Sequence, residues 1–194
     1  PNRGLDGLLH RVCAVERAMT CSALKPQGLP PETLAEIARR MAEGGVDFIK
    51  DDHGLADQAY SPFARRVAAV QAALRATGRK SCYLPSLSGS LDQMRSQVEQ
   101  AQREGVDFVL VAPMIAGLAN FQALVRAYPR MGFMTHPAMA GAARIAPPLL
   151  LGKLFRLMGS DATVFPNHGG RFGYSPETCR ALAEACRRPY GGRR

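Results

Sequence analysis

The sequence predicts an α/β fold in which short parallel strands alternate with helices, as in a (β/α)8 or TIM barrel. A helix that ends in glycine, followed by a hydrophobe, an aspartate and an apolar strand, occurs at 45–49 and 105–111 and, more loosely, at 159–165. Two further apolar runs, 81–86 and 131–136, are predicted as strands between these copies. The repeat of about 28 residues is close to that of a barrel of about 250 residues, so about six of its eight β/α units are expected.

The elements before the first copy of this repeat follow from local signals. A weakly amphipathic segment, 4–15, leads toward the core. The first strand, 18–24, stops at Lys25, because the proline after it disfavours helix in the preceding residue and cannot donate to a strand ladder. A helix is predicted from Pro30 to Gly44, with proline and an acid in its first turn and an apolar stripe along its length.

Length and composition indicate one globular domain. The chain has 194 residues, of which 46% are apolar and 21% charged, so disordered and collagen-like classes are excluded. No apolar run approaches the roughly 18 residues of a membrane span, and the first residues lack the layout of a signal peptide. We therefore expect a cytoplasmic protein with no membrane partner.

The net charge of +9 could indicate a nucleic-acid partner. The arginines are spread along the chain, however, often in helix-like segments such as Arg39-Arg40 and Arg65-Arg66. We interpret them as a solvated basic surface and expect no nucleic-acid binding.

The cysteines are predicted to be reduced, buried thiols, with disulfides or a metal site as the alternative. Their number is odd, they form no C-x-x-C pair, and two of them lie in apolar, strand-like runs. The five are Cys13, Cys21, Cys82, Cys179 and Cys186.

Polar side chains follow the carboxyl ends of several predicted strands. They are Lys25, Lys50 with Asp52 and His53, Ser86 with Ser88, His136, and Asn167-His168-Gly169-Gly170. In a barrel these ends converge on one rim, where the catalytic residues of that fold lie. Their placement favours a barrel over the alternative, an open doubly wound sheet.

Two lysines beside neighbouring carboxylates suit proton-transfer chemistry. Burial or a nearby like charge lowers the pKa of a lysine toward that of a useful general base. Asp51 and Asp52 suit Mg2+ in a partly water-filled shell, and the alternative is a helix N-cap or a solvated turn. Taken singly, each lysine is better explained as a surface cation and each histidine as an ordinary polar residue.

Four motifs carry a family resemblance. They are Leu24-Lys25-Pro26, Gly45-Val46-Asp47-Phe48-Ile49-Lys50-Asp51-Asp52, Ser86-Leu87-Ser88-Gly89 and Thr135-His136-Pro137-Ala138-Met139. In order and spacing they resemble the large chain of ribulose-bisphosphate carboxylase (RuBisCO), and most closely its form IV branch, the RuBisCO-like proteins. The resemblance covers almost the whole chain and implies the C-terminal barrel domain of that family.

The resemblance also implies that residues 1–194 are a partial barrel domain. Family members carry an N-terminal α+β domain before the first strand and two further strands after the sixth helix. In the family a neighbouring subunit completes the active site, so a homodimer is expected for the full-length protein. Residues 1–194 alone are expected to have little activity.

Residue by residue, the resemblance implies a metal-assisted enolisation site. Lys50 would be the lysine that carbon dioxide carbamylates, its carbamate would bind Mg2+, and Asp52 would be the partner carboxylate. Lys25 would handle protons during enolisation, while His136 and Ser86 would lie beside the substrate. Together they describe proton abstraction next to a carbonyl, with Mg2+ stabilising the enediolate.

Three departures from the carboxylase pattern shape the predicted function. His53 replaces a glutamate ligand and is predicted either to bind the metal or to leave that position to water; its nitrogen suits Mn2+, Fe2+ or Zn2+ better than Mg2+. Pro137 replaces an arginine that grips a phosphate, which favours a monophosphate substrate.

The third departure is the loop after the sixth strand, 164–173, which contains no lysine, so carboxylation is not expected. Its Asn167, Gly169, Gly170 and Arg171 are predicted to approach an anionic group, with a flexible turn as the alternative.

The resemblance thus implies a RuBisCO-like isomerase or lyase that acts on a phosphorylated sugar or sugar acid. The expected reactions are isomerisation or enolisation of a methylthio-pentulose phosphate, or decarboxylation of a 3-oxo sugar-acid phosphate. The alternative from another class is a non-catalytic relic or binding protein.

Overall fold

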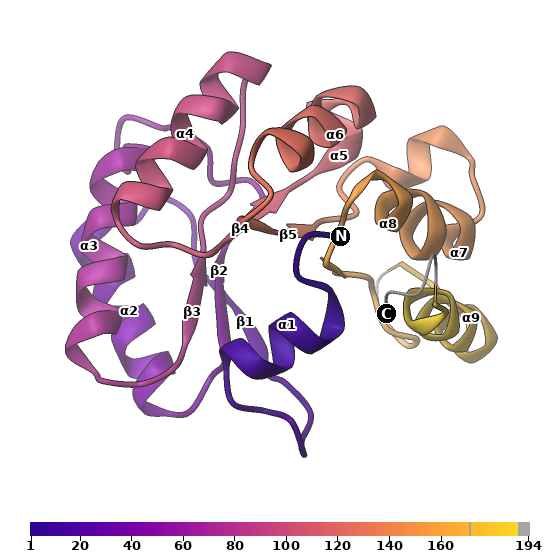
Figure 1. Cartoon of the computed structure of the whole chain (residues 1–194), viewed down its shortest axis with the longest axis horizontal. Helices are drawn as coiled ribbons and strands as arrows, with labels where there is room; N and C mark the ends of the chain where they lie inside the picture. The colour runs from indigo at the N-terminus through magenta and orange to yellow at the C-terminus, as the bar shows by residue number, and fades with distance from the viewer. Residues whose placement is uncertain (171, 190–194) are drawn as a thin grey trace.

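The fold is seen in a computed structural model that describes residues 1–170 and 172–189 (Figure 1). Short parallel strands alternate with helices. The strands are β1 (Cys21–Leu24), β2 (Phe48–Asp51), β3 (Cys82–Leu84), β4 (Phe108–Val111), β5 (Gly132–Thr135) and β6 (Ala162–Thr163). The prediction of an α/β fold with repeated strand and helix units is confirmed.

Helices follow most of the strands. They are α1 (Gly4–Arg11), α2 (Pro31–Glu43), α3 (Phe63–Ala76), α4 (Leu91–Arg103), α5 (Pro113–Ala116), α6 (Leu118–Ala127), η1 (Ala140–Ala143), α7 (Pro147–Leu149), η2 (Leu150–Leu154), α8 (Phe155–Met158) and α9 (Pro176–Arg187). Between α2 and β2, Gly45 has a φ of +86°, which lets the chain leave the helix and enter the strand at once.

The strands form one curved parallel sheet. Their hydrogen-bonded order is β1-β2-β3 and β4-β5-β6, and every pair is parallel. A parallel bridge between Ser86 and Leu110 joins the two groups. Helices α2, α3, α4, α6 and α8 contact one another in turn and lie outside the arc of strands in Figure 1.

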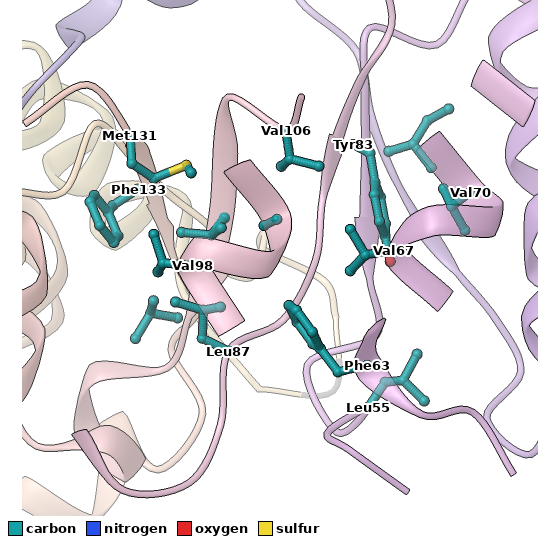
Figure 2. Packing of buried hydrophobic residues seen from close by; sticks show 14 of the residues in the cluster. Leu55, Phe63, Val67, Val70, Tyr83, Leu87, Val98, Val106, Met131 and Phe133 are labelled. Atoms are coloured by element: carbon teal, nitrogen blue, oxygen red, sulfur yellow. The ribbon is translucent and has the colours of Figure 1, made fainter. Parts of the chain in front are cut away.

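Side chains alternate between two apolar layers. Ile49, Tyr83 and Phe133 point outward into the layer between sheet and helices, part of which Figure 2 shows. Phe48 and Phe108 point inward, where their rings meet edge to face at 5.8 Å. Because both faces of the sheet are covered, the strands are continuous apolar runs, as parallel strands usually are.

The N-terminal segment covers the inner layer at the amino ends of the strands. The sequence predicted only that it leads toward the core. Leu8, Val12 and Ala14 are buried among the inward-facing strand residues. Each aspartate of the repeated motif accepts hydrogen bonds from residues 3–17, which are called the N-terminal segment from here on. The pairs are Asp47 with Arg17 (2.6 Å), Asp107 with Arg11 (2.6 Å), and Asp161 with the N–H groups of Arg3 and Gly4 (2.6 and 2.8 Å).

All five cysteines are free of disulfides, but their predicted burial is only partly correct. Cys82 is buried, and burial raises the pKa of its thiol to about 12. Cys13 and Cys21 are exposed. Cys21 begins β1, which in the described part of the chain has a strand neighbour on one side, so an apolar run alone did not reveal that it lies at an edge.

Within residues 1–170 and 172–189, no helix combines the length and apolar character that crossing a membrane requires.

The Asp47–Arg17 pair allows a test of how the N-terminal segment is held. Hydrogen bonds from Arg17 lower the pKa of Asp47 to about 2. Its contribution to stability is therefore fully present above about pH 4, the ordinary pKa of an aspartate, and is lost as the pH falls toward about 2. We expect Asp47→Asn to lower the free energy of unfolding by about 1–2 kcal/mol near neutral pH, since Arg17 is half exposed.

Urea denaturation near neutral pH and near about pH 3 measures this contribution, and the difference between variant and wild type should shrink at the lower pH. Equal unfolding free energies for both proteins near neutral pH would contradict the assignment.

Candidate active site

The predicted rim residues come together at the carboxyl ends of β1, β2 and β5. Lys50 points inward from β2 beside Ala23 of β1, since alternate residues of a strand face the same side. It is 8% exposed, and its ammonium group donates to the carbonyl of Asp51 at 3.2 Å. Burial lowers the pKa of Lys50, so its neutral amine is easier to reach than that of a surface lysine.

Asp52 is the acceptor at the centre of the cluster. Its carboxylate lies 2.5 Å from the ammonium group of Lys25 and 3.2 Å from Nδ1 of His53. It also accepts a hydrogen bond from the N–H of Gly54 at 3.1 Å. Burial acts to raise the pKa of Asp52, but the hydrogen bonds from Lys25 and Gly54 outweigh it and hold the pKa at about 2.

His53 and His136 stack face to face, with ring centroids 4.0 Å apart and planes 6° apart. Nδ1 of His136 accepts a hydrogen bond from the N–H of Ala138 at 3.1 Å, so Nε2 carries the proton of the neutral ring. Burial, followed by the nearby His53 and Lys50, lowers the pKa of His136 to about 3. The ring is therefore a neutral donor near neutral pH.

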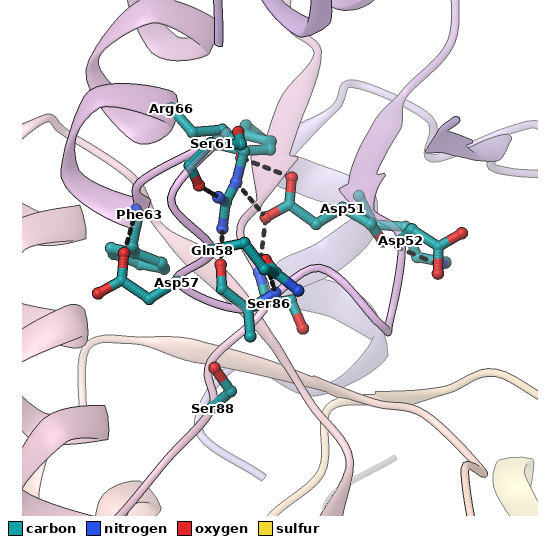
Figure 3. Close-up of polar contacts among 12 residues, drawn as sticks. Asp51, Asp52, Asp57, Gln58, Ser61, Phe63, Arg66, Ser86 and Ser88 are labelled. Carbon is teal, nitrogen blue, oxygen red and sulfur yellow. Dashed lines mark hydrogen bonds and ion pairs between the residues drawn. The ribbon is translucent and has the colours of Figure 1, made fainter. Parts of the chain in front are cut away.

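Asp51 does not join the rim. It is fully buried, points to the opposite side of β2, and accepts a hydrogen bond from Arg66 at 3.0 Å (Figure 3). The expectation that Asp51 belongs to a metal-binding pair, an N-cap or a solvated turn is wrong, because strand alternation places it on the helix side. The inclusion of Arg66 in a solvated basic surface is also wrong, since this arginine is fully buried.

Two larger hollows open beside the cluster. One, of about 630 Å3, is lined by Lys25 and Lys50 together with Met134 and Phe165. The other, of about 650 Å3, is largely apolar. Its lining includes His53, His136, Pro137, Met139, Phe165, Asn167, Gly170, Phe172 and Tyr174.

The remaining predicted residues are placed as follows. Ser86 and His53 line a small hollow of about 60 Å3, so Ser86 lies next to the rim cluster. Asn167 and Gly170 line the apolar hollow, whereas Gly169, with a φ of +71°, is a turn residue outside its lining. Arg171 lies outside the described residues.

Several contacts of the site were missed at the level of sequence. The His53–His136 stack joins residues that follow β2 and β5, two strands that are not neighbours in the sheet, so local sequence carries no signal for it. The burial of Arg66 does leave a signal. It lies three residues after Phe63 and four before Val70, both buried, and so shares the apolar face of α3.

The fold and the cluster define an α/β protein with a lysine, carboxylate and histidine site at the ends of parallel strands. Residues 5–188 match the family described as the ribulose bisphosphate carboxylase large chain, catalytic domain. The chain therefore belongs to the RuBisCO large-chain family, and the predicted resemblance is confirmed.

Individual relatives give a finer comparison. The chain is 61% identical to the 5-methylthioribulose-1-phosphate isomerase of Rhodospirillum rubrum, over 99% of this chain and 53% of that protein. It is 33% identical to the 2,3-diketo-5-methylthiopentyl-1-phosphate enolase of Geobacillus kaustophilus, over 95% of this chain and 48% of that protein. It thus spans about half the length of the curated relatives it matches.

A solved structure shows the same fold. The Rubisco-like protein from Rhodopseudomonas palustris superposes with a TM-score of 0.96 at 58% identity, over 98% of this chain and 55% of that one. The chain is therefore similar to RuBisCO-like proteins in both sequence and structure.

The environment of His136 predicts an unusual titration. In the metal-free protein we expect its ring to stay neutral from neutral pH down to about pH 4, because its pKa is lowered to about 3. The unfolded chain binds this proton near its ordinary pKa of about 6.5, so the free energy of unfolding falls as the pH drops below that value. NMR titration of the histidine ring protons, assigned with His136→Gln, measures the effect, and a midpoint near 6.5 for His136 would show that the ring is solvated.

Proposed function

We propose that this protein is a RuBisCO-like isomerase that moves a proton beside the carbonyl of a methylthio-pentulose phosphate. The observation that carries the proposal is the convergence of Lys25, Lys50 and His136, from three different strands, around the carboxylate of Asp52. The 61% identity to a protein named 5-methylthioribulose-1-phosphate isomerase supports this substrate.

The proposal includes the larger assembly. The curved six-stranded sheet, together with its likeness to RuBisCO-like structures, supports a complete (β/α)8 barrel in which residues 1–194 supply six units. We infer that an N-terminal domain and two further strands complete the site in a homodimer. A cytoplasmic location stays a prediction of the sequence.

The chain's own residues can share the proton transfers. Lys25, held by Asp52, would take or deliver a proton at the substrate, and the 62% exposure of its side chain supports this role. The neutral ring of His136 can donate from Nε2 to a substrate oxygen on which charge develops. Because burial lowers the pKa of Lys50, its amine loses its proton more easily than that of a surface lysine. The neutral amine would then serve as a second proton acceptor or react with carbon dioxide.

A Mg2+ ion fits these residues only with a carbamate on Lys50. Within the described residues, no three His, Cys, Asp or Glu side chains gather to hold a metal ion. A carbamate on Lys50 beside Asp52 would supply two anionic oxygen ligands, and Mg2+ commonly binds one or two such groups while keeping several waters. His53 would then either supply a third ligand or leave that position to water. When bound, the ion would stabilise the negative charge of an enediolate.

The apolar hollow favours a methylthio group over a second phosphate. Pro137, Met139, Phe165 and Tyr174 line it next to His136. Transfer of an apolar alkylthio end from water into this hollow is favourable. Transfer of a phosphate is unfavourable, because the phosphate would lose its hydration. The predicted preference for a monophosphate agrees with this lining.

Other reactions of the same site remain alternatives. The 33% identity to a 2,3-diketo-5-methylthiopentyl-1-phosphate enolase supports enolisation of a related diketone, which needs the same proton abstraction. Decarboxylation of a 3-oxo sugar-acid phosphate passes through a similar enediolate. The absence of lysine in 164–173 argues against carboxylation, and the family membership and close relatives argue against a non-catalytic relic.

Loss of Lys50 should abolish proton transfer. We expect Lys50→Ala in the full-length gene product to lower kcat at least about 100-fold, because the buried amine can no longer act as a proton acceptor or a carbamate carrier. The measurement is solvent-deuterium incorporation into 5-methylthioribulose 1-phosphate by NMR, with Mg2+ and bicarbonate present. Lys153→Ala, an exposed lysine, is the control and should stay within about two-fold of wild type.

No incorporation by wild-type protein, or an undiminished rate in Lys50→Ala, would overturn the proposed function.

The apolar hollow should favour a substrate with a methylthio group over one with a hydroxyl group at the same position. We expect ribulose 1-phosphate, which carries a hydroxyl in place of the methylthio group, to have a kcat/KM lower by about 10- to 200-fold. Phe165→Ala should narrow that ratio, since it removes part of the apolar lining. Steady-state kinetics with both compounds provide the test, and an unchanged ratio in Phe165→Ala would place the methylthio group elsewhere.

A further inference from the structure

A buried ion pair lies directly behind the rim, on the helix side of β2. Asp51 and Arg66 are both 0% exposed, and Nε of Arg66 lies 3.0 Å from Oδ2 of Asp51. Asp51 is flanked in sequence by Lys50 and Asp52, which face the rim. Neither Asp51 nor Arg66 belongs to the rim cluster, so the proton-transfer chemistry proposed above leaves the pair without a role.

Asp51 joins the end of β2 to the end of β3. Its Oδ1 accepts a hydrogen bond from the hydroxyl of Tyr83 at 2.7 Å, and its Oδ2 accepts another from the N–H of Ser86 at 3.0 Å. Ser86 begins the turn through Gly89 that faces His53 across the small hollow. The carboxylate therefore fixes where that turn leaves the sheet.

Arg66 joins α3 to the loop 52–62. Its Nη2 donates to the carbonyl of Ala56 at 2.9 Å. Its Nη1 donates to the carbonyl of Ser61 at 2.5 Å, and Figure 3 shows these two residues from close by. This loop begins with Asp52 and His53, two members of the rim cluster. The guanidinium thus holds the middle and the end of the loop, and its third contact is with Asp51, the residue directly before the loop.

Stability alone gives a weak reason for such a pair. Removing two charges from water costs several kcal/mol per ion, and apolar residues of similar volume often serve a protein as well or better. The hydrogen bonds of this pair run to backbone groups of two loops that carry rim residues. Partners of this kind, one layer behind a site, set the orientation of the groups that act in it.

We propose that Asp51 and Arg66 are positioning residues that hold the loop 52–62 and the turn 86–89 in fixed register, so that Asp52, His53 and Ser86 meet at the rim. The effect that this proposal predicts on kcat rests on the proposed function, whereas the effect that it predicts on the order of the two loops does not. Asp51 and Arg66 touch no reacting atom and act through the backbone of these two loops.

Two mild variants test the proposal in the full-length gene product. Arg66→Lys keeps the charge beside Asp51 but cannot donate to both loop carbonyls, and Tyr83→Phe removes one donor from Asp51. Asp47→Asn is the control, because it breaks an ion pair between a buried aspartate and a half-exposed arginine just before the same strand, away from the rim. The readouts are kcat and KM for 5-methylthioribulose 1-phosphate, the melting temperature, and hydrogen–deuterium exchange by peptide.

We expect kcat to fall about 10- to 100-fold in Arg66→Lys, with a smaller fall in Tyr83→Phe and little change of KM in either. Exchange should rise in the peptides that cover 52–62 and 85–90. Asp47→Asn should lower the melting temperature and raise exchange in the N-terminal segment, with kcat unchanged.

Two results would overturn the proposal. One is unchanged exchange at 52–62 and 85–90 in both variants. The other is a fall in kcat that is proportional to the loss of melting temperature across all three variants, Asp47→Asn included, because stability alone would then explain it. A wild-type protein without activity would refute the proposed function instead, and the exchange measurement would then decide the positioning role by itself.

Discussion

The alternation of side chains along β2 is the constraint on which the rest of the structure depends. Both faces of this strand are buried, so each residue must satisfy either the inner layer or the helix layer. Phe48 and Lys50 face inward, while Ile49 and Asp51 face the helices. A charged residue on either face therefore needs its own partner, and the two aspartates that adjoin in sequence end up in separate environments, one at the rim and one behind it.

Much of the fold was predictable because its signals are local. Glycine-ended helices followed by apolar strands indicated the β/α units, and Lys25, Lys50 and His136 were placed at strand ends by position alone. The partners of these groups were harder to predict. The stack of His53 on His136 and the bonds from Arg66 to Ala56 and Ser61 depend on how separate segments pack, and a single sequence carries no direct record of that packing.

The structure defines the contacts of His53, which the sequence left open. Its ring is fixed on one face by His136, and its Nδ1 lies beside Asp52. It therefore shares the carboxylate with Lys25 and at the same time forms part of the wall of the apolar hollow. A change at this position affects both the charge balance of Asp52 and the shape of the space next to His136, so the two effects are coupled in any variant of it.

The aspartates of the repeated motif have a consequence for synthesis on the ribosome. They hold a segment that is not itself repeated, and the bond from Arg3 to Asp161 spans 158 residues. Residues 3 and 4 leave the ribosome long before their acceptor exists. The hydrogen bonds from residues 3 and 4 can therefore form only when the chain has been made as far as the sixth strand, whereas Leu8 and Val12 pack against strands that are made earlier.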